Sequence, residues 1–171
     1  MSGGNRYLEE MFGLGATVAV ITGGAGVIAG ALAAALLKAG AKVALWELQH
    51  GAVDEAISRL TETVEGAKDR LFGYEVDTGI EDAVAKAIEA TEKAFGPPNL
   101  LVNGGGGNRG KYAFVDQDME TFEFVLKLNL VAGLMVPTKV FAAYWIKGKI
   151  KGAIINMASM ASYIPLSGVW A

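Results

Sequence analysis

The sequence predicts an α/β fold in which a parallel sheet carries helices on both faces, a three-layer and doubly wound arrangement. The first observation behind this prediction is that short apolar runs rich in β-branched residues alternate with longer helical segments along the chain. The second is that a glycine cluster joins the first apolar run to the segment that follows it. Parallel strands of this kind require right-handed crossovers through the intervening helices.

The expected strands are short apolar runs, at residues 17–21, 42–46, 71–76, 100–102 and 153–157. The expected helices lie between them, at residues 27–37, 52–64, 79–95 and 116–146. Thr78 and Glu81 have the spacing of a capping box at the start of the third helix. Residues 1–14 are expected to form a loose leader, with Phe12 and Leu14 against the edge of the sheet.

The bulk composition limits the classes of function. The net charge is −3 and no block of lysine or arginine occurs, so neither nucleic acid nor an anionic membrane is expected as a partner. The chain has no cysteine, which excludes disulfides and thiolate chemistry and suits a cytoplasmic protein. The uncharged run from Phe12 to Leu37 is long enough to imitate a membrane span. Its glycines and its change of periodicity favour a strand followed by a helix, so we expect a soluble protein.

The glycine cluster consists of Gly23, Gly24 and Gly26, between the first strand and the first helix. Residues without Cβ allow a tight turn, and the following helix directs free N–H groups and a positive dipole end at its occupant. Glu47 ends the second strand, where an acidic side chain of a dinucleotide-binding fold accepts hydrogen bonds from the adenosine ribose. The set predicts a dinucleotide whose diphosphate lies in this turn. The alternative is an ordinary strand-turn-helix corner with a surface glutamate.

Ligands of parallel sheets bind where the strands end, and several unusual residues stand at such positions. Asp77 follows the third strand, Asn103 and residues 104–107 follow the fourth, and Ser159 follows the fifth. Four successive glycines cost backbone entropy on folding, which indicates close approach of a ligand. The alternatives are a capping neighbour for Asp77, a floppy surface loop for the glycines and a turn residue for Ser159.

With these motifs, residues 13–171 resemble the short-chain dehydrogenase/reductases, a family with a Rossmann-type fold. Residues 22–29 are similar to the family's glycine motif, although Val27 and Ala29 stand where glycines are usual. Residues 101–106 are similar to the family's Asn-Asn-Ala-Gly strand end. The resemblance implies a cofactor site formed by Gly23, Gly24, Gly26, Val27, Ile28, Glu47, Asp77, Asn103, Gly104 and Gly105.

The resemblance also implies which cofactor binds. Glu47 occupies the acidic position that the family associates with NAD rather than NADP. No arginine or lysine stands in the glycine turn or beside Glu47 to hold a 2′-phosphate, which also favours NAD. Asp77 matches the family's aspartate near the adenine, and no metal is expected.

Two further residues match the family's catalytic site. Asn129 matches an asparagine that supports the proton relay, with a tolerated polar helix residue as the alternative. Ser159 matches the serine that donates a hydrogen bond to the substrate oxygen and stabilises its developing negative charge. The family's acid/base tyrosine, with a lysine four residues on, is expected just beyond Ala171. No tyrosine of the chain has such a lysine, and His50 is expected to be a solvated turn residue.

Together these features predict a single NAD-binding domain, residues 1–171, truncated after its fifth strand. The expected function is hydride transfer between NAD and a secondary alcohol or ketone, and the chain alone is expected to bind NAD without turnover. Residues 103–108 and 126–141 resemble the fructuronate reductase and D-mannonate oxidoreductase subgroup, which implies a sugar-acid substrate. The rival is a non-catalytic nucleotide-binding or interaction module. The long helix, residues 116–146, is expected to join protomers in a homo-oligomer.

Overall fold

The structure, a computed structural model, describes residues 3–164 and 167–168 and is built around a five-stranded parallel sheet. The strand order is β3-β2-β1-β4-β5, so the chain starts in the middle of the sheet and builds first one half and then the other. Every strand lies within one residue of its expected bounds. The strands are β1 (Val18–Thr22), β2 (Lys42–Glu47), β3 (Leu71–Glu75), β4 (Leu100–Asn103) and β5 (Ala153–Asn156).

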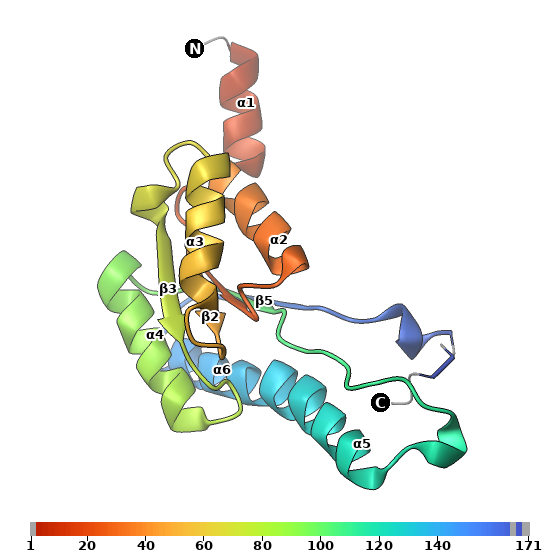
Figure 1. Cartoon of the computed structure of the whole chain (residues 1–171). Helices are drawn as coiled ribbons and strands as arrows, with labels where there is room; N and C mark the ends of the chain where they lie inside the picture. Colours follow the sequence, from red (N-terminus) through yellow and green to blue (C-terminus); the bar gives the residue numbers. More distant parts are fainter. Residues whose placement is uncertain (1–2, 165–166, 169–171) are drawn as a thin grey trace.

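Helices cover both faces of this sheet (Figure 1). In the central strand, Ala19 and Ile21 pack with α2 and α3 on one face, while Val20 packs with α4 and α6 on the other. Successive strand residues point to opposite faces, so each layer takes alternate side chains. The predicted three-layer, doubly wound α/β fold is confirmed. The covering helices are α2 (Val27–Lys38), α3 (Ala52–Thr63), α4 (Glu81–Phe95) and α6 (Val136–Gly148).

The first helix differs from the prediction. α1 spans Gly3–Phe12, where the sequence predicts a loose leader, and it projects from the rest of the protein (Figure 1). Residues 8–11 are leucine, glutamate and methionine, which are good helix formers, and they outweigh the glycines that precede them. Phe12 is 68% exposed and does not pack on the sheet, whereas Leu14 packs against the core beneath α2 and α3.

The predicted capping box of Thr78 and Glu81 is wrong. α4 begins at Glu81, and its N-cap is Ile80, which makes no side-chain capping bond. The Glu81 carboxylate accepts a hydrogen bond from a lysine of α6 instead of reaching back to its own helix end. The preceding turn is closed by Asp77, whose Oδ1 accepts a hydrogen bond from the Gly79 N–H (2.8 Å). An aspartate that binds the N–H two residues on competes with the threonine cap for the same turn.

The long helix begins at Met119 rather than at residue 116 and runs to Gly148. Its N-cap is Asp118, whose carboxylate accepts a hydrogen bond from the Thr121 N–H (2.7 Å), and this bond holds the pKa of Asp118 below its ordinary value. α5 (Met119–Leu126) leads into a π-helical segment, Lys127–Met135, and α6 follows. The sequence carries no signal for the π segment, although such wide turns often mark functional sites.

Within the described residues, one helix, Met119–Gly148, is long and apolar enough to cross a membrane, with 28% of its most apolar window buried. Core helices of soluble proteins pass the same test of length and composition. The uncharged run from Phe12 to Leu37 forms β1 and α2, as the sequence predicts, and is not one continuous span. Of the predicted single domain, residues 1–2, 165–166 and 169–171 lie outside the described residues.

Candidate functional site

The turn between β1 and α2 requires glycine at two positions. Gly23 has a φ of +63°, and a Cβ added to it would lie 2.8 Å from the Cα of Gly105. A Cβ added to Gly24 would lie 2.8 Å from the Cβ of Leu45 in β2. The turn is therefore shaped by two close backbone approaches that no larger residue allows.

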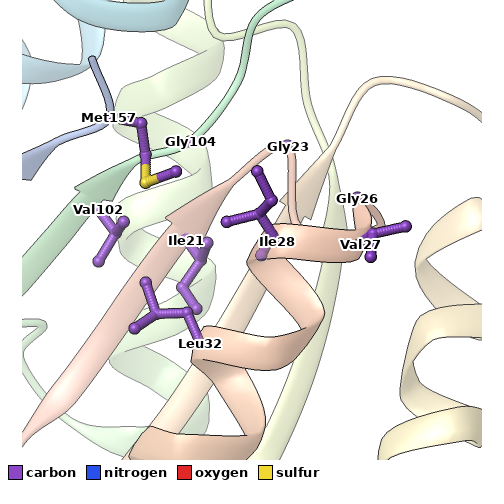
Figure 2. Close-up of a pocket in the computed structure, with 10 residues that line it drawn as sticks. Ile21, Gly23, Gly26, Val27, Ile28, Leu32, Val102, Gly104 and Met157 are labelled. Carbon is purple, nitrogen blue, oxygen red and sulfur yellow. The ribbon is translucent and has the colours of Figure 1, made fainter. Parts of the chain in front are cut away.

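α2 begins beside this turn with an N-terminus that no side chain caps. Its N-cap is Gly26, which leaves the first N–H groups of the helix for another acceptor. Val27 and Ile28 are 91% and 66% exposed, and they line a cavity of about 290 Å³ together with Gly104 and Met157 (Figure 2). Free N–H groups and the positive end of the helix dipole together favour an anion at this place.

Glu47 ends β2, and its carboxylate reaches the glycine turn. Its Oε2 accepts a hydrogen bond from the Ala25 N–H (3.2 Å). Its Oε1 accepts hydrogen bonds from the N–H groups of Leu48 (2.8 Å) and Gln49 (3.3 Å). A carboxylate offers about four lone-pair directions, so backbone groups occupy three and about one remains for a ligand. The structure therefore places Glu47 at the predicted turn, but with most of its acceptor capacity already used.

Thr22, the last residue of β1, joins the turn to the glycine run, residues 104–107. Its side chain is fully buried, and its Oγ1 accepts hydrogen bonds from the N–H groups of Gly104 and Gly105, both at 3.1 Å. The hydroxyl itself donates to the Val102 carbonyl (3.5 Å). Sequence reasoning does not select Thr22 as a site residue. The available signal is a hydroxyl residue at the end of a buried strand, directly before a glycine turn.

Asn129, in the π-helical segment, binds the far end of the glycine run. The Gly107 N–H donates to its Oδ1 (2.7 Å), and its Nδ2 donates to the Gly107 carbonyl (2.9 Å). A Cβ on Gly106 would lie 2.7 Å from the same Oδ1, and a Cβ on Gly133 would overlap the carbonyl of Gly105. The glycine run is thus packed against the long helix and is not a floppy surface loop.

Asn103, the last residue of β4, is only 3% exposed. Its Nδ2 donates to Thr138 Oγ1 (2.9 Å) and to Asn156 Oδ1 (2.8 Å), and Asn156 is its partner in the β4–β5 register. Its own Oδ1 is buried without a hydrogen-bond partner. A buried acceptor of this kind costs free energy unless a ligand or a water donates to it. Asn103 therefore ties β4 to β5 and α6, and only its oxygen is left for a ligand.

Asp77 and Glu47 line one cavity of about 370 Å³, at the ends of β2 and β3. Asp77 is exposed, and its Oδ1 accepts the hydrogen bond from the Gly79 N–H within its own turn. Gly24 does not line this cavity, because its backbone faces β2. The predicted cofactor residues that the cavity brings together are Gly23, Gly26, Glu47, Asp77, Gly104 and Gly105.

Ser159 follows β5 and lines a third cavity, of about 660 Å³, with Asn103, Asn129 and the glycine run. Its Oγ accepts a hydrogen bond from the Ala161 N–H (3.2 Å) and so caps a short 3₁₀ turn. Ser159 is therefore a turn residue, and its hydroxyl still has its own hydrogen to donate into the cavity.

The three cavities adjoin along the carboxyl edge of the sheet, because Gly104 lines all of them. In Figure 2, Gly23 and Ile28 lie on one side of the first cavity and Met157 on the other. Among the described residues, no group of three or more histidine, cysteine, aspartate or glutamate side chains is arranged to hold a metal ion.

Two titratable groups with shifted pKa values lie away from these cavities. The ring of His50 is exposed, and its Nδ1 lies 2.8 Å from Glu75 Oε1; their hydrogen bond raises the pKa of His50 and lowers that of Glu75. Burial, together with the nearby Glu92 carboxylate, raises the pKa of Tyr144 to about 12. Neither His50 nor Tyr144 lines any of the three cavities, so neither stands in for the expected acid/base tyrosine.

Comparison with known proteins supplies the family. The family model for short chain dehydrogenases matches residues 17–171. The chain belongs to the short-chain dehydrogenase family. This dehydrogenase-family chain is 34% identical over 146 residues to (+)-borneol dehydrogenase 2 of Salvia officinalis, covering 85% of the chain and 49% of that relative. It is 30% identical over 166 residues to an uncharacterized oxidoreductase of Haemophilus influenzae, covering 88% of the chain and 56% of that relative.

Solved structures agree with this dehydrogenase fold. A candidate D-mannonate oxidoreductase from Haemophilus influenza with bound NAD superposes with a TM-score of 0.81 at 28% identity, covering 95% of this chain and 61% of that one. The chain spans about half the length of the curated relatives that it matches. The names of the relatives point to different substrates, so membership of the short-chain dehydrogenases establishes an oxidoreductase family but no substrate.

Proposed function

We propose that the whole protein is an NAD-dependent oxidoreductase that transfers a hydride between nicotinamide and a secondary alcohol or ketone. The observation that carries this proposal is the row of adjoining cavities along the carboxyl edge of the sheet. The glycine turn lines the cavity that holds Glu47 and also the cavity of about 290 Å³ that holds Ile28. The second of these adjoins the cavity that holds Ser159. An extended dinucleotide has the same order, with adenosine, diphosphate and nicotinamide in a row.

The residues present fit this cofactor. Gly23 and Gly26 line two of the cavities, and the uncapped start of α2 offers N–H groups to a diphosphate. Glu47, with about one acceptor direction left, and Asp77 would hold the adenosine end. When bound, NAD supplies the ring that accepts or gives the hydride.

The protein's own part in the reaction is to orient the substrate and to stabilise charge on its oxygen. Ser159 donates the hydrogen bond to the substrate oxygen in this proposal, because it lines the cavity of about 660 Å³. Asn129 supports the relay from the same cavity while both ends of its amide hold Gly107. None of the five tyrosines has a lysine four residues on, so we propose that the chain binds NAD without turning over.

A sugar acid is the substrate class that we propose. The support is the likeness of residues 103–108 and 126–141 to the fructuronate reductase and D-mannonate oxidoreductase subgroup. The candidate D-mannonate oxidoreductase among the solved structures, at 28% identity, points the same way. The test is to measure the rate at which the whole protein oxidises NADH with keto-uronates and with other ketones. A faster rate with the other ketones would refute this substrate class.

The cofactor proposal is tested by titrating the chain with NADH and following the nicotinamide fluorescence. We expect saturable binding, and we expect Glu47→Gln to weaken it about fivefold. The substitution replaces the charged carboxylate that accepts a hydrogen bond from the ribose hydroxyl. Glu65→Gln is the matched control, since it removes the same charge from an exposed glutamate after the last turn of α3, away from the cavities. An unmutated chain that does not bind NADH would refute the proposal.

Turnover separates the enzyme from a non-catalytic nucleotide-binding module. We expect NADH oxidation by the whole protein but not by the 171-residue chain, and a Ser159→Ala loss of about 100-fold in kcat for the whole protein. Binding of NADH by the whole protein without turnover of any carbonyl compound would favour the binding module. Turnover by the 171-residue chain would show that its own residues supply the acid/base.

We also propose a cytoplasmic homo-oligomer assembled through the long helix. The support is a set of apolar side chains on that helix that remain 46–57% exposed, namely Phe124, Leu130 and Met135. Burying such residues between protomers is favourable because it removes apolar surface from water. Light scattering on the whole protein should show a dimer or tetramer, and Leu130→Glu should dissociate it. A monomer at all concentrations would contradict this assembly.

A further inference from the structure

Arg59 of α3 contacts the glycine turn, although it stands far from it in the sequence. Its Nη2 donates a hydrogen bond to the Ala25 carbonyl (3.3 Å). The N–H of the same Ala25 donates to Glu47 Oε2 (3.2 Å). A guanidinium and a carboxylate therefore both bind the backbone of Ala25. No arginine is close to the turn along the sequence, but the fold brings Arg59 beside it.

Glu47 is a weaker barrier to a phosphorylated ribose than its position in the sequence implies. Its carboxylate already accepts hydrogen bonds from three backbone N–H groups, at 2.8, 3.2 and 3.3 Å. These donors offset part of the negative charge that a 2′-phosphate would meet. They also leave about one lone-pair direction for the two ribose hydroxyls of NAD.

We propose that Arg59 binds the 2′-phosphate of NADP, so that the site accepts NADP as well as NAD. This inference rests on the proposed function, namely that a dinucleotide occupies the glycine turn. The bond to Ala25 uses one of the five N–H donors of a guanidinium, and the planar fork of the others matches phosphate oxygens. Arg59 is exposed, so a phosphate reaches it without the cost of burying either charge.

The test is to titrate the chain in parallel with NADH and NADPH. We expect the unmutated chain to bind both, with affinities within about tenfold of each other. Arg59→Gln should weaken NADPH about tenfold and NADH less than about twofold, because only NADPH loses a charge-assisted bond. Arg59→Lys should keep part of the NADPH affinity, since it retains the charge without the fork. Added salt should lower NADPH affinity more steeply than NADH affinity.

Lys93→Gln is the matched control, because it removes the same charge from the opposite edge of the sheet. Lys93 is exposed in the last turn of α4. This end of α4 lies beside the start of β2, because the Phe95 carbonyl accepts a hydrogen bond from the Lys42 side chain. This variant should change neither affinity. Thermal unfolding of each variant checks that the fold is intact.

The outcomes separate this inference from the proposed function. Equal weakening of NADH and NADPH by Arg59→Gln would mean that Arg59 only anchors Ala25, and it would overturn the inference. Binding of NADH without binding of NADPH would also overturn it and leave the proposed function standing. Binding of neither dinucleotide by the unmutated chain would refute both.

Discussion

The two strands that lead into the candidate site are held in very different ways. β1 is buried at all five residues and pairs with β2 and β4, whereas β5 is an edge strand with three exposed residues of four. The glycine turn therefore extends from the middle of the core, and Ser159 extends from the rim of the sheet. The cofactor half of the site, around the glycine turn, is therefore preorganised by packing. The second half, around Ser159, depends on fewer contacts.

Several side-chain hydrogen bonds hold the second half of the site, around Ser159. Asn156 of β5 binds Asn103 side chain to side chain, and Asn103 in turn binds Thr138 of α6. The glycine run is held by Thr22 on one side and by Asn129 on the other. Because few apolar side chains of β5 are buried, these hydrogen bonds position the chain around the Ser159 cavity.

The largest effect is expected from a pair of matched isoleucine substitutions, one in β1 and one in β5. Ile21→Ala in β1 should lower the free energy of unfolding by about 2–5 kcal/mol, because the side chain is fully buried and leaves a cavity. Ile155→Ala in β5 should cost less than about 1 kcal/mol, because Ile155 is 47% exposed. Urea unfolding of the chain measures both values. Equal losses would break the comparison.

The second test concerns the backbone of the glycine turn. Gly23→Ala should weaken NADH binding at least about tenfold, because the left-handed φ of +63° strains an L residue and its Cβ would meet Gly105. Gly15→Ala is the control, since a Cβ there meets nothing within 4 Å. Fluorescence titration gives both affinities. Tight binding by the Gly23 variant would show that the turn does not hold the cofactor.

The third test concerns the polar connection between β4 and β5. Asn156→Ala should cost about 1–3 kcal/mol of unfolding free energy, because it removes one acceptor from the buried Nδ2 of Asn103. We expect it to reduce turnover by the whole protein more than it reduces NADH affinity. A larger effect on NADH affinity than on turnover would assign the Asn103 pair to the cofactor half instead.

The smallest expected effect concerns the exposed pair of His50 and Glu75. The pKa of His50 is raised, so its stabilising contribution is complete at low pH and is lost as the pH rises through that raised pKa. The pKa of Glu75 is lowered, so its contribution is lost as the pH falls through that lowered pKa. Between the two values both contributions are present.

Substituting Glu75 isolates this pair. Glu75→Gln should return the pKa of His50 toward its ordinary value in an NMR titration, with little change in stability because both groups are exposed. Asp54→Asn is the control, because Asp54 contributes less to the raised pKa of His50 than Glu75 does. A pKa of His50 that responds only to Asp54 would contradict the observed pairing.

Much of the fold could be predicted because its signals are local. Apolar runs and glycine positions are properties of neighbouring residues, and they placed every strand and the turn before α2. The errors arose where two local options compete for the same backbone groups. Asp77 closed the turn that Thr78 was expected to cap, and helix formers in residues 8–11 outweighed the glycines before them.

The sequence by itself determined the parallel α/β architecture, the glycine turn and the acidic residue at the end of β2, because hydrophobic period and missing Cβ atoms act within a few residues. Only the tertiary structure decided what surrounds the turn. Asn129 meets Gly107 across 22 residues of chain, and Arg59 meets Ala25 across 34. Such contacts depend on how the π-helical segment and α3 pack against the sheet, and no spacing along the chain encodes that packing.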